Sequence, residues 1–60
     1  MSLEELIDQM QDEMHSAHEE IEKFIAGNKS AGTRARKSMQ NIKTCAQTVR
    51  QEIQEIKNNS

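Results

Sequence analysis

Two uninterrupted heptad patterns of apolar residues run through this chain, one in each half. The first consists of Leu3, Ile7, Met10, Met14, Ala17, Ile21 and Phe24. The second consists of Ala35, Met39, Ile42, Ala46, Val49, Ile53 and Ile56. Both alternate steps of four and three residues, which places an apolar stripe along one side of an α-helix. The chain contains no proline to interrupt either half. The spacing therefore predicts an all-α protein.

Gly27 and Asn28 separate the two patterns. A glycine readily adopts the left-handed conformation that ends many helices, and an asparagine can cap the N-terminus of the next helix. Such a short break between long helices favours an antiparallel helical hairpin. We predict one domain of residues 1–60, with a helix at about 2–26, a turn at 27–28 and a second helix at about 29–57. The alternative is an extended two-stranded coiled coil in which Gly27 is a flexible point.

The small apolar content predicts assembly. One hairpin of 60 residues has few apolar side chains, and a core of this size rarely supplies more than roughly 3–5 kcal/mol without an additional constraint. Cys45 is the only cysteine, so no disulfide can form within the chain. Leu6 and Ile25 in the first half, and Ala31 and Cys45 in the second, widen the apolar faces beyond what one hairpin covers. We therefore expect a homodimer in which two hairpins form a four-helix bundle.

Charge is divided between the two halves of the chain. Residues 1–22 carry eight acidic side chains and no basic one, whereas residues 23–50 carry seven basic side chains and no acidic one. The net charge of −2 would argue against a polyanionic partner, but the basic half can bind one locally. Residues 27–37 alternate small residues with cations, so this segment can lie close to a phosphate backbone.

A row of cations follows the second predicted helix. Lys29, Arg36, Lys43, Arg50 and Lys57 recur every seven residues. At 1.5 Å per residue the row is about 42 Å long, and duplex DNA presents phosphates on that scale. Arg34 and Lys37 are expected to widen the row near the turn. The residues predicted to bind DNA are Lys29, Arg34, Arg36, Lys37, Lys43 and Arg50. The alternative is pairing with acidic side chains of a neighbouring helix, although the first helix offers few of these near the turn.

Residues 27–37, Gly-Asn-Lys-Ser-Ala-Gly-Thr-Arg-Ala-Arg-Lys, resemble the central motif of the chlamydial linker-histone-like nucleoid proteins. Ile42-Lys43 and Val49-Arg50-Gln51-Glu52 are similar to later elements of that family, so the resemblance covers about residues 20–57. It implies a DNA-binding, chromatin-compacting role, with matched positions at Lys29, Arg34, Arg36 and Lys37. The bacterial members usually continue into a Lys/Ala-rich tail, and we expect this chain to be a short form without it.

The remaining patterns favour no chemistry. We identify no catalytic residue, cofactor or small-molecule substrate, and an enzyme is not expected. His15 and His18 share a helix face with acidic residues, but they lie beside or outside the apolar stripe, so solvated histidines are expected instead of a metal site. We expect no signal peptide, because the N-terminus is acidic and lacks an apolar region, and no membrane span, because no stretch approaches about 20 apolar residues. The lone thiol suits a reducing, intracellular compartment.

These features predict a histone-like architectural protein. It would contact the phosphates of double-stranded DNA without sequence specificity and compact or bridge DNA, in a nucleoid or on viral DNA. Two alternatives remain. The first is a coiled-coil adaptor for structure or assembly, without a nucleic-acid role. The second is a regulator whose acidic first helix binds a basic partner.

Overall fold

The first helix begins and ends at side chains suited to these positions. In the computed structural model, which describes residues 2–59, helix α1 spans Leu3–Ile25. The hydroxyl of Ser2 caps it by accepting a hydrogen bond from the backbone N–H of Glu5 (3.1 Å). Glu4 and Glu5 lie in the first turn, where negative charge is favourable. The predicted domain of residues 1–60 also includes Met1 and Ser60, which lie outside the described residues.

Gly27 and Asn28 form the turn. Gly27 has a positive φ of 111°, and its N–H donates to the carbonyl of Phe24 (3.0 Å). The N–H of Asn28 donates to the carbonyl of Lys23 (3.0 Å), which completes a Schellman motif. The side chain of Asn28 then caps the next helix by accepting from the N–H of Ala31 (3.3 Å). Two consecutive residues thus end one helix and begin the other.

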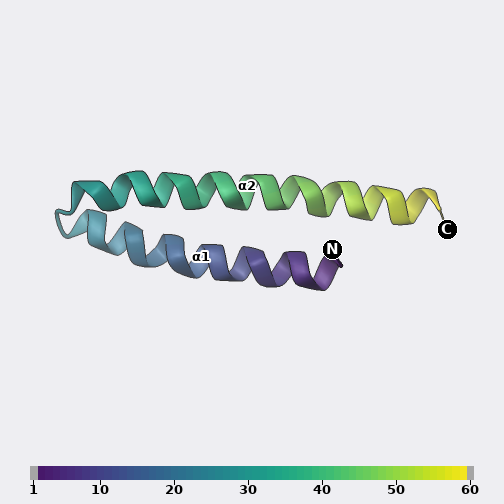
Figure 1. Cartoon of the computed structure of the whole chain (residues 1–60), viewed down its shortest axis with the longest axis horizontal. Helices are drawn as coiled ribbons and strands as arrows, with labels where there is room; N and C mark the ends of the chain where they lie inside the picture. Colours follow the sequence, from purple (N-terminus) through teal and green to yellow (C-terminus); the bar gives the residue numbers. More distant parts are fainter. Residues whose placement is uncertain (1, 60) are drawn as a thin grey trace.

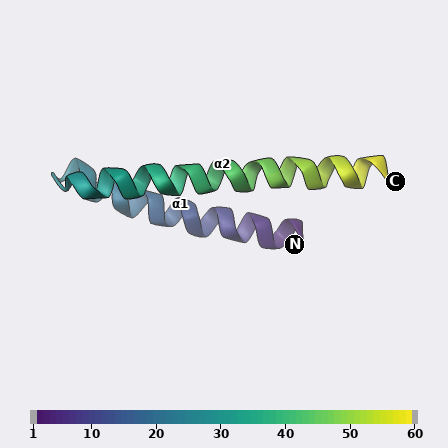
Figure 2. The same ribbon diagram turned by 45° about the horizontal axis from the view of Figure 1, so that its top comes forward.

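Helix α2 spans Lys29–Asn58 and lies antiparallel to α1 (Figure 1). The helix bounds differ by at most one residue from those predicted from sequence. The residues that the structure describes contain these two helices and no strand. The fold is therefore an all-α hairpin, and its Cα atoms extend over 50 × 14 × 13 Å. The turned view confirms that the helices remain side by side and that α2 continues beyond the start of α1 (Figure 2).

The interior of the hairpin is built mainly from small residues. Its buried residues are Leu6, Ala17, Ala31, Ala35 and Ser38. Ala17 and Ala35 belong to the heptad patterns, whereas Leu6 and Ala31 were expected only to widen the apolar faces. Small side chains allow two helix backbones to approach closely, which favours these positions for the contact between α1 and α2.

The bulkier half of each heptad pattern lies outside this contact. Apart from Phe24 beside the turn, the large apolar residues with exposed fractions between 37% and 52% define what we call the outer apolar face: Ile7, Met14, Ile21, Met39 and Ile53. Met14 and Met39, which belong to the heptad patterns, therefore lie outside the interior of the hairpin. The residues one position earlier on α1 (Leu6, Glu13 and Glu20) face α2 instead. The apolar surface of each helix is wider than a contact with one neighbour can cover.

Candidate nucleic-acid interface

The cations of α2 lie on more than one side of the helix. Residues seven apart return to nearly the same direction, so Lys29, Arg36, Lys43 and Arg50 form one exposed row. Arg34 is about 200° around the helix from Arg36 and points to the opposite side. Arg34 therefore does not widen the row as expected.

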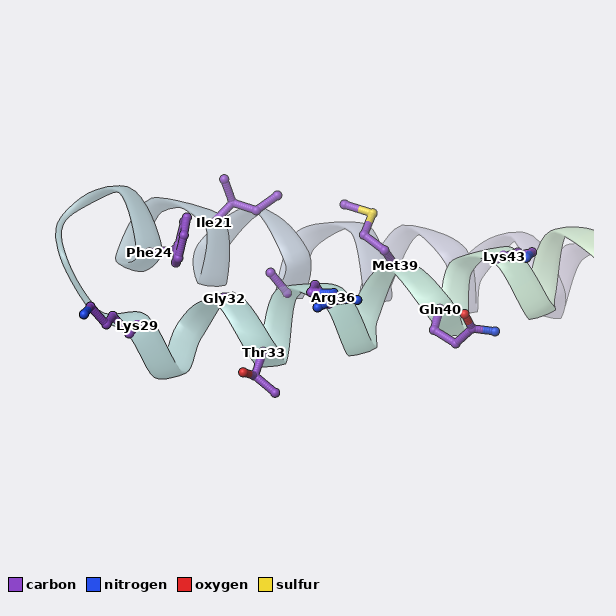
Figure 3. A pocket seen from close by; sticks show the side chains of 10 residues that line it. Ile21, Phe24, Lys29, Gly32, Thr33, Arg36, Met39, Gln40 and Lys43 are labelled. Carbon is purple, nitrogen blue, oxygen red and sulfur yellow. The ribbon is translucent and has the colours of Figure 1, made fainter.

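The N-terminal part of the row borders an open groove of about 760 Å³ near the turn (Figure 3). Lys29, Arg36 and Lys43 contribute to its lining together with apolar residues. The apolar part consists of Ile21, Phe24, Gly32, Ala35 and Met39. Residues from both helices thus create an apolar surface with cations along its α2 side.

Gly32 gives the groove its floor. A Cβ atom at this position would lie 2.8 Å from Cδ1 and 2.9 Å from Cε1 of Phe24, closer than carbon atoms approach without displacement. The Phe24 ring therefore packs directly over the backbone of α2, at the place where Figure 3 shows it standing above Gly32. The sequence places small residues at positions 31, 32 and 35 beside the turn, and the structure shows that Phe24 covers Gly32 among them.

Arg34 already has a partner within the hairpin. Its Nε donates to Oε2 of Glu20 over 2.8 Å, and the side chain of Glu20 is only 16% exposed. Lys23 lies 3.7 Å from the other oxygen of the same carboxylate. The hydrogen bond from Arg34 lowers the pKa of Glu20 below its ordinary value of 4.5. The expectation that the cations near the turn lack internal partners is therefore wrong for Arg34.

The other predicted DNA contacts remain available. Lys29, Arg36, Lys37, Lys43 and Arg50 are all exposed, and no carboxylate within residues 2–59 forms an ion pair with them. Lys37 is about 100° around α2 from Arg36, so it lies beside the row and not within it. The structure thus brings together Lys29, Arg36, Lys43 and Arg50, and it separates Lys37 and Arg34 from them.

The histidines pair along α1. Nε2 of His15 lies 3.1 Å from Glu19, and Nε2 of His18 lies 2.7 Å from Glu22. Both histidines are exposed, and residues 2–59 contain no group of three or more side chains that could hold a metal ion. No helix in this range is long and apolar enough to cross a membrane.

Comparison with known proteins supports the resemblance of residues 20–57. No curated protein and no solved structure matches the chain. A family model described as "Histone H1-like protein Hc1" matches residues 4–59, which include all of α1 except Leu3, the turn, all of α2 and every cation of the exposed row. The chain therefore belongs to the histone H1-like protein Hc1 family.

Proposed function

We propose that this protein is an architectural DNA-binding protein that contacts the phosphates of duplex DNA and compacts or bridges DNA in a nucleoid or on viral DNA. The observation that carries the proposal is the exposed row of Lys29, Arg36, Lys43 and Arg50, which have no carboxylate partner within residues 2–59. Membership of the histone H1-like family supports the same function. Neither observation favours an enzyme.

The shape of the row supports binding without sequence specificity. Its four cations extend over about 32 Å of a straight helix, and contacts to phosphates carry no direct base information. Helix α2 contains no aromatic residue on which bases of a single strand could stack, and the ring of Phe24 beside it packs against Gly32. The expected ligand is therefore duplex DNA, bound through its charge.

The outer apolar face supports a homodimer. Its five large side chains are partly exposed in one hairpin, and a second hairpin would bury them in a four-helix bundle. A face about 20 Å wide and 34 Å long has an area of roughly 700 Å². This is close to the roughly 800 Å² per partner of an ordinary specific interface.

A titration of duplex DNA at several salt concentrations tests the proposal. If about 4–6 phosphates are neutralised per dimer, log K should decrease against log salt with a slope of roughly −4 to −5. Replacing Lys29, Arg36 and Lys43 together by alanine should weaken binding equally for unrelated sequences and flatten this slope. Lys57→Ala is the control, because Lys57 already interacts with another group of the chain. Absence of binding at low salt, or an unchanged slope in the triple variant, would contradict the proposal.

A coiled-coil adaptor is the second candidate function. It is favoured by the apolar groove, since such a groove can receive the apolar face of a helix from another protein. The same titration separates the two functions. An adaptor without a nucleic-acid role would not bind duplex DNA even at low salt.

A further inference from the structure

Helix α2 extends beyond α1 at the open end of the hairpin. Sγ of Cys45 lies 3.3 Å from the carbonyl oxygen of Leu6, so the start of α1 is reached near residue 50 of α2. The remainder of α2 has no α1 residue beside it in either view (Figures 1 and 2). Ile53 and Ile56 lie on this extension, and both are exposed. The extension is therefore an apolar segment without a neighbour in the hairpin.

The opposite end of the hairpin has an apolar groove that can receive an apolar side chain. The groove of Ile21, Phe24, Gly32, Ala35 and Met39 lies beside the turn, and its floor is a residue without a side chain. One end of the molecule thus has a projecting isoleucine, and the other end has an open apolar groove beside the Phe24 ring.

Side-chain size alternates along the row of α2 that contains Met39 and Ile53, the two α2 residues of the outer apolar face. Gly32, Met39, Ala46 and Ile53 recur every seven residues, and they alternate between small and large. When two α2 helices pack antiparallel, the register that places Gly32 opposite Ile53 of a second copy also places Met39 opposite its Ala46. Every layer then pairs a large residue with a small one, which is how well-packed helix interfaces fill space. A parallel pairing would place equal sizes opposite each other.

We propose that a second copy of this chain docks on the outer apolar face with its turn at the opposite end, so that Ile53 of each copy enters the groove beside Phe24 and Gly32 of the other. This arrangement rests on the dimer of the proposed function and defines its orientation. The twofold axis lies across the bundle, so α2 packs against α2 and α1 against α1. The interface has the area of roughly 700 Å² per copy given above, which is close to the roughly 800 Å² per partner of an ordinary specific interface.

The orientation determines where the cations lie. In this orientation the two α2 helices lie side by side. The exposed cation rows of the two copies, each beginning at Lys29, then lie along the same α2–α2 contact and form one basic side of the bundle. The two α1 helices, with Glu4 and Glu22, form the other side. A dimer would therefore bind one duplex along its basic side, and the phosphates would offset repulsion between the two rows. If both turns were at the same end, twofold symmetry would place the rows on opposite sides, as required to bridge two duplexes.

An exchange of side-chain sizes tests the layers. Ala46→Met should place methionine opposite methionine and weaken dimerisation at least about tenfold. Adding Met39→Ala restores one large and one small residue in each layer, so the double variant should return to within about threefold of the parent. Sedimentation equilibrium measures both dissociation constants, and circular dichroism verifies that each variant is helical. A double variant that dimerises no better than Ala46→Met would overturn the antiparallel layers.

A distance measurement tests the orientation directly. A spin label can be attached at Ser30→Cys after the free thiol has been removed by Cys45→Ser. Position 30 lies on the exposed side of α2, away from the proposed contact between the two α2 helices. In the antiparallel dimer the two labels are about 38 Å apart along the bundle, whereas with the turns at one end only the width of about 20 Å separates them. Double electron–electron resonance on the labelled protein should give the longer distance of about 38 Å in the absence of DNA. A short distance, or a distance that appears only after DNA is added, would overturn the inference. DNA binding is measured separately by the salt titration, so a wrong orientation would leave the phosphate-binding proposal standing.

Discussion

Because Gly32 contacts Phe24, we expect Gly32→Ala to change the free energy of unfolding in opposite directions with and without the Phe24 ring. Gly32→Ala would ordinarily stabilise a helix interior by about 1 kcal/mol. Here the new Cβ would lie 2.8 Å from the Phe24 ring, so the ring must move away from α2. Phe24 is 51% exposed, so about half of its surface is buried, on the order of 100 Å² for an aromatic residue. At 25 cal/mol per Å², loss of that contact costs up to about 2.5 kcal/mol, which exceeds the gain.

A double-mutant cycle isolates this effect. In the parent, Gly32→Ala should decrease the free energy of unfolding by about 1 kcal/mol, whereas in a Phe24→Ala background it should increase it by about 1 kcal/mol. Urea denaturation followed by circular dichroism at one protein concentration measures all four proteins. Any effect of position 32 on association that does not involve Phe24 cancels in the difference. Thr33→Ala, on an exposed helical position, is the control for a simple change of helix propensity. Equal stabilisation by Gly32→Ala in both backgrounds would refute the reasoning.

Further predictions concern the ion pair, acid stability, the turn and assembly. Glu20→Gln releases Arg34 on the side of α2 opposite the basic row, so the salt slope of DNA binding should stay within about 1 of the parent value, as it should in Glu13→Gln, which removes the same charge without releasing an arginine. Because the pKa of Glu20 is lowered in the folded state, its ion pair stabilises the fold above pH 4.5, and this contribution is lost as pH decreases through the lowered pKa; acid titration of stability should therefore be shallower in Glu20→Gln. Gly27→Val should decrease the melting temperature and lower the free energy of unfolding by roughly 1 kcal/mol or more. No atom lies within 4 Å of a new Cβ, so the cost comes from the positive φ of 111°, which a β-branched residue resists. Gly27→Asn should cost less, because asparagine adopts positive φ more readily. The melting temperature of the parent should increase with protein concentration in calorimetry, and a concentration-independent value would contradict a dimer.

The helices and the turn could be predicted from the sequence because their causes are local. The heptad spacing, the absence of proline and the preference of Gly27 and Asn28 for cap positions act within a few residues. The basic row of α2 could also be predicted, because a spacing of seven residues on a helix places side chains on one side whatever the surroundings. The family resemblance of residues 27–37, which the family match confirms, also rests on local sequence.

The tertiary structure decided which part of each apolar surface faces inward. The large residues of the heptad patterns, Ile7 and Met14 among them, were the natural candidates for the interior, yet Leu6, Ala17 and Ala31 are buried instead. A small rotation of a helix about its axis exchanges one row of apolar side chains for the neighbouring row at the contact. Which row faces inward depends on how closely the two helix backbones can approach. That distance is set jointly by small residues from both helices, and the pairing of Arg34 with Glu20 across the turn follows from it. Local sequence determined the two helices, whereas contact between them determined which apolar surface and which cations remained outside.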